Sequence, residues 1–325
     1  MRDVFIVTVT YNSGNVIGYF LESLKSQGIN AKVVIVDNNS EDNTLEEVRR
    51  FREKCKHDST CLLRIDVLKL KKNYFYGGGI NVALRYIISN YKPDKDSIII
   101  VSNPDVVFDH NALKTLIEKV SKNALVQCTI LKDNGLVDNQ GFIVSDAITL
   151  YKVGENGDVN YVSPLIRYVN FISGACFAAT IETFFKIGYF DERIDLYCED
   201  LEFSLRALCR DIEMIIVPEC RVIHLESTSI TSSRKKWYLL IKNCGYVAYK
   251  YFGLKKLLAY LFLKLIFSIT LGGKFIVPFI KGLYVLLRNI TLHNYNRVKC
   301  NLVRSIYSYR ILLRYQLWQV RKRLL

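Results

Sequence analysis

Short apolar runs alternate with amphipathic segments over the first 120 residues. Four runs rich in Val and Ile are typical of strands buried on both faces of a sheet: 5–10, 32–37, 65–70 and 97–101. Four segments with helical spacing or a capping signal predict helices: 15–27, 44–54, 79–90 and 111–121. Strands and helices that alternate at this interval form βαβ units, so an α/β fold with a mainly parallel sheet is expected.

The alternation loosens after about residue 124. Shorter strands are predicted there at 125–130, 141–151, 160–163, 168–180, 213–217 and 220–224, with one helix at 199–210. No internal repeat or low-complexity tract is present.

Charge divides the chain into two parts. The 325 residues carry 45 Lys+Arg and 31 Asp+Glu, a formal net charge of +14. Residues 234–325 contain 19 basic residues and no Asp or Glu, whereas residues 1–233 carry a net charge of −5. We therefore expect a catalytic domain over 1–233 and a basic helical region over 234–325.

The basic region favours an anionic membrane surface as its partner. Its apolar stretches 257–271 and 275–287 are shorter than the roughly 20 residues of a spanning helix, so interfacial helices fit better than a membrane-embedded hairpin. Residues 294–325 form a basic amphipathic pattern. An ordinary helical subdomain and nucleic-acid binding are the alternatives, and no nucleic acid is expected. Attachment to the cytoplasmic face of the membrane is the expected location.

Nine cysteines, odd in number and without a C-x-x-C pair, support neither a zinc ribbon nor a disulfide framework. Reduced thiols in a cytoplasmic compartment are expected. The N-terminus runs directly into a strand-like segment and lacks a signal-peptide pattern.

Polar residues appear abruptly where the first two strands end. Thr8 and Tyr11 close the first, and Asp37 and Asn38 close the second. Ligands of parallel sheets bind at this edge, where a carboxylate and amides are able to bind a base and ribose. Ordinary turns use the same residue types, which leaves that alternative open.

Two further motifs follow the next strands. Three glycines, including Gly78 and Gly79, precede Asn81 at a predicted helix start, where backbone N–H groups favour an anion. Neither G-x-G-x-x-G nor a phosphate-loop pattern occurs, so a dinucleotide fold or a phosphate-loop NTPase is not supported. Asn103 and Asp105 follow the fourth strand, and a carboxylate there suits a divalent cation. A glycine turn without a ligand and a solvated aspartate are the alternatives.

The densest group of acids contains Asp191, Glu199 and Asp200, interleaved with aromatic residues. Acids also favour helix N-termini, but the apolar residues around Glu199 and Asp200 indicate a carboxylate at the mouth of a pocket, suited to act as a general base. His224 follows the last strand, as a metal ligand or as a structural histidine.

These motifs, in this order, resemble the family 2 inverting glycosyltransferases of GT-A fold, in particular the rhamnosyltransferase-like subgroup. The matching segments span roughly residues 3–230: 9–12, 37–40, 73–81, 103–105, 174–175, 190–192, 199–200 and 224. Asn103 replaces the first acid of the usual D-x-D motif.

The resemblance implies a nucleotide-diphospho-sugar donor (UDP- or dTDP-sugar), a glycan or lipid-linked acceptor, and Mg²⁺ or Mn²⁺. The residues it places in the nucleotide-sugar site are Thr8, Tyr11, Asp37, Asn38, Gly78, Gly79, Asn81 and Asn103. It places the metal on Asp105 and His224, makes Asp200 the base, and puts Glu199 and Asp191 on the acceptor side. A non-catalytic nucleotide-sugar-binding or membrane-scaffold protein on the same fold is the alternative.

Overall fold

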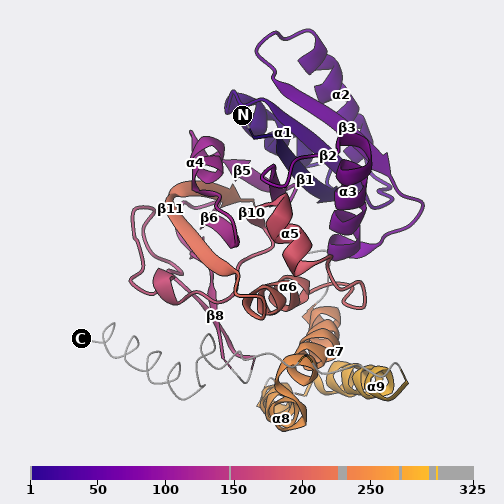
Figure 1. Ribbon diagram of the computed structural model, residues 1–325. Helices are drawn as coiled ribbons and strands as arrows, with labels where there is room; N and C mark the ends of the chain where they lie inside the picture. Colours follow the sequence, from indigo (N-terminus) through magenta and orange to yellow (C-terminus); the bar gives the residue numbers. More distant parts are fainter. Residues whose placement is uncertain (1, 146–147, 226–232, 271–272, 293–297, 299–325) are drawn as a thin grey trace.

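A mixed β-sheet of nine strands lies at the centre of the N-terminal part of the protein (Figure 1). The structure is a computed structural model and describes residues 2–145, 148–225, 233–270, 273–292 and 298. The sheet order is β3-β2-β1-β4-β10-β6-β11-β5, with β7 paired to β6. This arrangement confirms the expected α/β fold.

The first half of the sheet is parallel and matches the four predicted apolar runs. Its strands are β1 (Val4–Thr10), β2 (Ala31–Asp37), β3 (Leu63–Lys69) and β4 (Ile98–Ser102). All seven residues of β1 are buried, because helices cover both faces of the sheet. The carboxyl ends of β1, β2 and β4 lie at one edge of the sheet, as parallel pairing requires.

The second half mixes directions and departs further from expectation. Its strands are β5 (Val106–Phe108), β6 (Ala124–Lys132), β7 (Val137–Asn139), β10 (Cys176–Thr180) and β11 (Glu213–His224). β11 joins the two predicted strands 213–217 and 220–224 through an irregularity between Val217 and Arg221. β8 (Phe142–Val144) and β9 (Leu150–Lys152) form a separate antiparallel pair.

The strand predicted at 160–163 is wrong, and the one predicted at 168–180 shrinks to β10. The Gln140 side chain forms hydrogen bonds with the backbone groups of this segment that would otherwise pair with a neighbouring strand. Its amide donates to the carbonyl of Tyr161 and accepts from the N–H of Ser163. A buried amide side chain therefore replaces a sheet ladder at this position.

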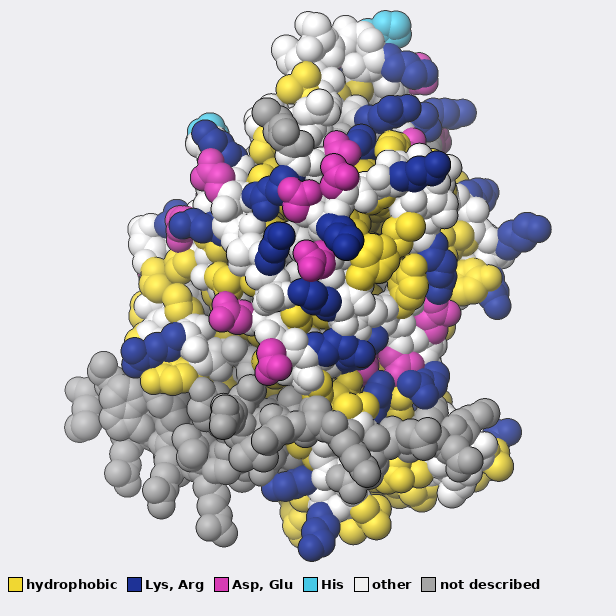
Figure 2. Space-filling view, viewed as in Figure 1, with side chains coloured by type: hydrophobic (Ala, Val, Ile, Leu, Met, Phe, Trp, Pro, Cys, Tyr) yellow, Lys and Arg dark blue, Asp and Glu magenta, His cyan; other side chains and the backbone are white. Residues whose placement is uncertain are grey.

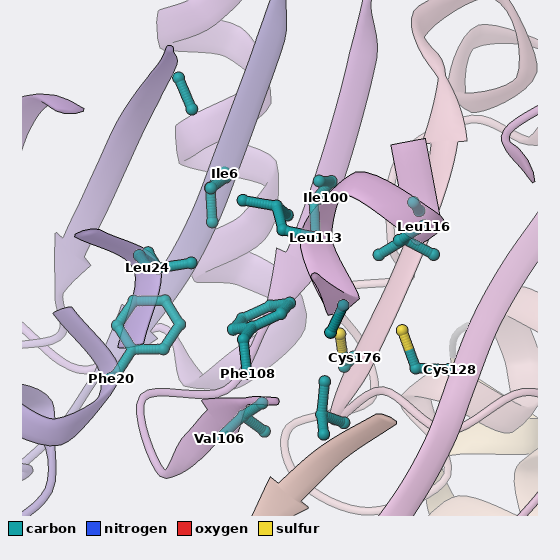
Figure 3. Packing of buried hydrophobic residues seen from close by; sticks show 14 of the residues in the cluster. Ile6, Phe20, Leu24, Ile100, Val106, Phe108, Leu113, Leu116, Cys128 and Cys176 are labelled. Carbon is teal, nitrogen blue, oxygen red and sulfur yellow. The ribbon is translucent and has the colours of Figure 1, made fainter. Parts of the chain in front are cut away.

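Helices cover both faces of the sheet. On one face, α1 (Ile17–Ser26), α2 (Thr44–Lys56) and α4 (Ala112–Lys119) share a hydrophobic core with the even-numbered residues of β1, shown in Figure 3. On the other, α3 (Phe75–Tyr91), α5 (Ile181–Ile187) and α6 (Glu199–Leu208) pack on its odd-numbered residues. The sheet is thus the middle of three layers.

Three further helices follow the sheet. They are α7 (Ser233–Phe252), α8 (Leu254–Thr270) and α9 (Ile276–Leu292), which pack with the outer side of α6 (Figure 1). The two apolar stretches are helical as expected, and α7 lies within the region expected to be helical, although no separate helix was predicted there. Among the described residues, no helix has the length and apolar character needed to cross a membrane. The amphipathic pattern at 294–325 lies outside the described residues apart from Val298.

Cysteine pairing differs from the expectation of reduced thiols. Among the described residues, disulfides join Cys55 to Cys61, Cys128 to Cys220 and Cys198 to Cys244. The sequence spacing gave no sign of them because two of the pairs are 92 and 46 residues apart and meet only in the fold. These bonds contradict the expected reduced thiols, and the location of the protein stays a prediction.

Candidate functional site

A cavity of about 550 Å³ opens at the carboxyl edge of the parallel strands. Segments distant in the sequence contribute to its wall: the ends of β1 and β4, the start of α3, the loop before α6 and the start of α7. The lining residues are Val9, Tyr11, Asn12, Ser13, Asn15, Val16, Asn38, Asn73, Phe75, Tyr76, Asn103, Pro104, Asp105, Leu196, Tyr197 and Lys235. The position matches the edge where α/β sheets bind ligands.

The loops after β1 and β2 are joined by hydrogen bonds. The Thr10 hydroxyl donates to Asp37 Oδ1 at 3.1 Å, and the other oxygen of that carboxylate accepts from the N–H of Ser40. The Asn12 N–H donates to the Ser40 hydroxyl at 2.9 Å. Asp37 is fully buried and lies behind the cavity wall, as does Thr8, so these two predicted nucleoside contacts are not part of the lining.

Asn38 determines how α3 begins. Its amide donates to the carbonyl of Phe75 at 2.9 Å, and its oxygen accepts from the N–H of Tyr74 at 3.1 Å. Asn73 accepts from the N–H of Phe75 at 2.7 Å, and Phe75 adopts a left-handed backbone with φ +60°. Strained backbone of this kind concentrates at functional sites, where surrounding contacts hold it in place.

The glycines lie inside the first turn of α3 rather than in a loop ahead of it. The helix begins at Phe75, four residues before the predicted start, and Gly78 and Gly79 are buried away from the cavity. A Cβ at Gly79 would lie 2.6 Å from Val9 Cγ1. These glycines allow α3 to pack closely on β1, and a direct contact with the donor stays a prediction.

Asn81 holds the loop before α6. Its side chain exchanges two hydrogen bonds with the backbone of Phe190, 2.8 Å to the N–H and 3.0 Å to the carbonyl, and also donates to Glu192. Because Asn81 is fully buried and absent from the lining, its position is that of a support.

Asp105 and His224 meet at the cavity. Their Oδ1 and Nε2 atoms are 3.2 Å apart, and Asp105 lines the wall. They come together because β11 pairs with β5, which places His224 opposite Val106. A group of three or more His, Cys, Asp and Glu side chains suited to a metal is not found among the described residues.

Glu199 and Asp200 open α6 beside the cavity. Asp200 accepts from the backbone N–H groups of Gly174 (3.1 Å) and Leu201 (2.9 Å). Tyr76, which lines the cavity, donates to the carbonyl of Gly174. Asp200 therefore contacts Gly174, the residue to which the cavity-lining Tyr76 is hydrogen-bonded.

Burial sets the protonation of this carboxyl pair. It raises the pKa of Glu199 well above its ordinary value, and the neighbouring Asp200 charge adds to the shift. Burial also raises the pKa of Asp200, although the N–H groups of Gly174 and Leu201 oppose that shift. Glu199 thus keeps its proton to higher pH, while Asp200 provides an ionised carboxylate with increased basicity.

Asp191 is an ionised member of a buried network rather than a cavity residue. Burial alone would raise its pKa, but hydrogen bonds from Arg193 and Lys250 outweigh burial and hold the pKa far below its usual range. Its carboxylate also accepts from the Tyr246 hydroxyl at 2.9 Å.

Only some predicted site residues line the cavity. Tyr11, Asn38, Asn103 and Asp105 do so, whereas the other predicted residues lie behind or beside it. Sequence reasoning missed Lys235, whose amino group belongs to a helix far along the chain. A cluster of three cations, Arg234 to Lys236, without an acid in the first turn of α7, was the available signal.

Comparison with known proteins finds a family to which part of the chain is similar. Residues 5–149 match the family model described as "Glycosyl transferase family 2". Over these residues this chain is similar to glycosyl transferase family 2. A similar curated protein is the rhamnosyltransferase WbbL of Escherichia coli, 24% identical over 248 residues that cover 73% of this chain and 89% of that protein.

Solved structures confirm the GT-A type of fold for this chain. The TarS protein of S. aureus in complex with UDP-GlcNAc gives a TM-score of 0.56 at 17% identity, covering 88% of this chain and 81% of that one. The mannosyltransferase PcManGT of Pyrobaculum calidifontis, in complex with GDP-Man and Mn²⁺, gives 0.52 at 14% identity, covering 90% and 76%.

Proposed function

We propose that this glycosyltransferase moves a sugar from a nucleotide-diphospho-sugar to a hydroxyl of a glycan or lipid-linked acceptor, with inversion, and that Asp200 is the general base. The observation that carries the proposal is the orientation of Asp200 by two backbone N–H groups beside the cavity wall. A fixed carboxylate with a raised pKa fits general-base catalysis, since base strength and position both matter.

The donor occupies the cavity of about 550 Å³ in this proposal. Tyr11 provides an exposed aromatic ring for the nucleoside, with Asn38 and Asn103 as polar partners on the same wall. Lys235 provides a positive charge for the diphosphate. TarS and PcManGT bind UDP-GlcNAc and GDP-Man, which supports a nucleotide-sugar donor for this chain, and a UDP- or dTDP-sugar is the donor proposed.

Asp105 and His224 fit a divalent cation. The 3.2 Å between Oδ1 and Nε2 is close to the separation of about 3 Å between adjacent ligands of a metal bound at about 2.1 Å. One carboxylate plus an imidazole suits Mn²⁺ at least as well as Mg²⁺, with substrate oxygens completing the shell. Such an ion supplies charge stabilisation for the departing diphosphate. PcManGT binds Mn²⁺ together with its sugar donor.

The reaction balances with these residues alone on the acceptor side. Asp200 takes the proton of the acceptor hydroxyl as its oxygen forms a bond to the anomeric carbon. The bond between that carbon and the diphosphate oxygen breaks, and the nucleoside diphosphate leaves with the bonding electrons. A single displacement inverts the anomeric configuration. The neutral form of Glu199 next to Asp200 leaves one negative charge at the reacting centre.

The helices after the sheet support attachment to an anionic membrane surface. Exposed apolar side chains occupy one stripe on α8 and another on α9: Leu254, Leu258, Phe262, Ile266, Ile269, Val277, Ile280, Tyr284 and Leu287. Exposed Lys255, Lys274, Lys281 and Arg288 accompany them, and hydrophobic and basic side chains occur together at this end of the molecule in Figure 2. Charge complementarity with anionic lipid favours a peripheral position on the cytoplasmic face.

A transfer assay tests the proposed function. The full chain is incubated with a panel of UDP-, dTDP- and GDP-sugars, Mn²⁺ and lipid-linked or free glycan acceptors, and nucleoside diphosphate release is measured with and without acceptor. We expect acceptor-dependent release with one class of donor, and loss of that release in Asp200→Asn by about 10²- to 10⁴-fold. Equal rates for Asp200→Asn and the unmodified chain would contradict the assigned base.

A further inference from the structure

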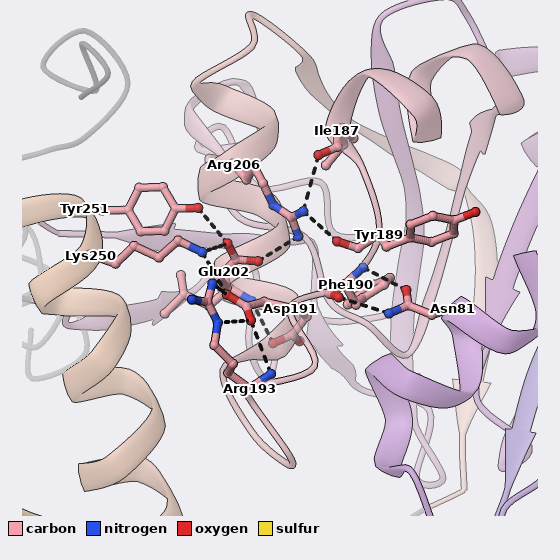
Figure 4. Close-up of polar contacts among 12 residues, drawn as sticks. Asn81, Ile187, Tyr189, Phe190, Asp191, Arg193, Glu202, Arg206, Lys250 and Tyr251 are labelled. Carbon is pink, nitrogen blue, oxygen red and sulfur yellow. Dashed lines mark hydrogen bonds and ion pairs between the residues drawn. The ribbon is translucent and has the colours of Figure 1, made fainter. Parts of the chain in front are cut away.

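α7 bears a lysine that is almost completely removed from solvent and that no step of the proposed reaction uses. Lys250 is 7% exposed, and its amino group lies between two carboxylates, 2.9 Å from Asp191 Oδ2 and 2.6 Å from Glu202 Oε1. The three side chains converge in Figure 4, with α7 on one side and the segment leading into α6 on the other.

The two carboxylates belong to the part of the chain that contains the proposed base. Asp191 lies in the loop before α6, and Glu202 lies on α6 two residues after Asp200. Glu202 is fully buried and also accepts from Tyr251 (2.7 Å) and Arg206 (2.8 Å). Lys250 therefore joins both ends of the segment 191–202 to one atom of α7.

A second side chain of α7 holds the middle of the same segment. The Asn243 amide donates to Asp195 Oδ1 at 2.9 Å and to the carbonyls of Leu196 and Tyr197 at 2.7 and 3.3 Å. Leu196 and Tyr197 line the cavity, and Tyr197 has a left-handed backbone with φ +66°. The strained turn directly before Glu199 is thus fastened to α7.

We infer that Lys250 is a positioning residue, which holds the loop at Asp191 and the helix at Glu202 in register and thereby fixes Asp200 in its place beside the cavity wall. The inference rests on the proposed function of Asp200. A buried charge between two carboxylates specifies one geometry, because any displacement of either partner leaves a charge unpaired in a region without water. The helices after the sheet are, in this view, part of the catalytic architecture.

The test measures turnover and donor binding separately in the full chain. We expect Lys250→Met to lower kcat at least tenfold while the Kd of nucleoside diphosphate changes less than about twofold, since Tyr11, Asn38 and Asn103 on the β1–β4 half of the site keep their places. Lys250→Arg keeps a cation and is expected to recover part of the loss. Lys114→Met, at an exposed position of α4, is the matched control and is expected to behave as the unmodified chain.

Milder variants keep the test decisive if Lys250→Met does not fold. Tyr246→Phe and Tyr251→Phe each remove one hydrogen bond from Asp191 or Glu202 without unpairing a charge. Each is expected to lower kcat by a smaller factor with donor Kd unchanged. Unchanged kcat in all folded variants, or a loss of donor affinity in step with kcat, overturns the inference.

Asp200→Asn measured in parallel separates this inference from the proposed function. If Asp200→Asn is inactive and the Lys250 and tyrosine variants retain full turnover, positioning by Lys250 is wrong and the base assignment stands. If Asp200→Asn is active, the base assignment fails, and with it the role inferred for Lys250.

Discussion

The adjacent carboxyl groups of Glu199 and Asp200 differ in the partners available to them. Asp200 accepts hydrogen bonds from two backbone N–H groups, whereas Glu199 Oε2 is buried with no hydrogen-bond partner among the described residues. Burial therefore raises the pKa of Glu199 further than that of Asp200. The proton of the pair resides on Glu199 at the pH where Asp200 acts as a base.

This difference predicts how the two positions respond to substitution. Glu199→Gln replaces a protonated carboxyl with a neutral amide of the same shape, so kcat/KM is expected to fall less than about tenfold, in contrast to the large loss in Asp200→Asn. The measurement is a pH–rate profile of both variants against the unmodified chain. A loss in Glu199→Gln as large as that in Asp200→Asn would mean that Glu199 works in its ionised form.

The pH profile of the unmodified chain follows from the same burial. Asp200 is active when ionised, and burial raises its pKa, so activity is expected to decline as pH falls through a value above the ordinary aspartate pKa of about 3.9. The acidic limb of kcat/KM measures that value. A limb at or below the ordinary aspartate pKa would contradict a buried base.

Close packing of elements gives a prediction for α3. A Cβ at Gly79 would lie 2.6 and 2.8 Å from the two γ-methyl groups of Val9 on β1, so Gly79→Ala is expected to lower the free energy of unfolding by about 1–3 kcal/mol. Gly18→Ala in α1 is the control, since nothing lies within 4 Å of a Cβ there. Denaturant unfolding is expected to show the control unchanged or stabilised by up to about 1 kcal/mol.

The opposite signs of these two variants distinguish packing from helix propensity. Alanine favours helix at both positions, so stabilisation of both would show that α3 can move away from β1 without cost. In that case the glycines would be needed for contact with the donor and not for the close packing of α3 on β1.

The disulfide between β6 and β11 stabilises the mixed half of the sheet. Cys128 and Cys220 are 92 residues apart, so their bond restricts a long loop of the unfolded chain. Reduction is expected to lower the free energy of unfolding by about 2–5 kcal/mol, measured by denaturant unfolding with and without reductant. Alkylation of the denatured, unreduced protein is the control. Labelling of Cys176 but not of Cys128 or Cys220 is expected, and equal labelling of all three would contradict the bond.

At the scale of the whole molecule, the hydrophobic pattern of the sequence predicted individual strands but not the pairing between distant ones. The runs that became β1, β2 and β4 are buried on both faces, a property of their own residues, whereas β3 lies at the edge of the sheet with only Ile65 of its residues buried. The place of β10 between β4 and β6 could not be predicted, since it depends on pairing between residues far apart in the chain. The meeting of the polar motifs at one edge of the sheet, at the carboxyl ends of β1, β2 and β4, could be predicted because it depends only on these local strands being parallel.

The site followed the same rule. Tyr11, Asn38 and Asp105 could be predicted because they follow buried strands directly, and such positions meet at one edge. The supporting roles of Asn81 and Lys250 could not be predicted, because their partners Phe190 and Asp191 lie 109 and 59 residues away. The sequence therefore indicated which polar residues gather near the cavity, but not which of them line its wall.

The distribution of apolar surface over the molecule leads to the last prediction. Leu258 and Phe262 on α8 are 57% and 63% exposed, in a region where basic residues occur without acids. Burial of each side chain in lipid contributes about 1.5–3 kcal/mol, so the double change Leu258→Ser and Phe262→Ser is expected to weaken binding of the full chain to anionic vesicles at least tenfold. Co-sedimentation with vesicles of phosphatidylserine and phosphatidylcholine measures the change.

Two controls assign the effect to this surface. Phe185→Ser removes an aromatic side chain of similar exposure, 57%, from α5 in the N-terminal part, and is expected to leave vesicle binding unchanged. Vesicles of phosphatidylcholine alone are expected to bind the unmodified chain more weakly, since the basic residues then lack anionic partners. Equal loss in Phe185→Ser and the α8 variant would show that exposed apolar residues in general cause the binding. Undiminished binding in the α8 variant would remove α8 from the membrane contact and leave the basic residues after position 292 as the region to test.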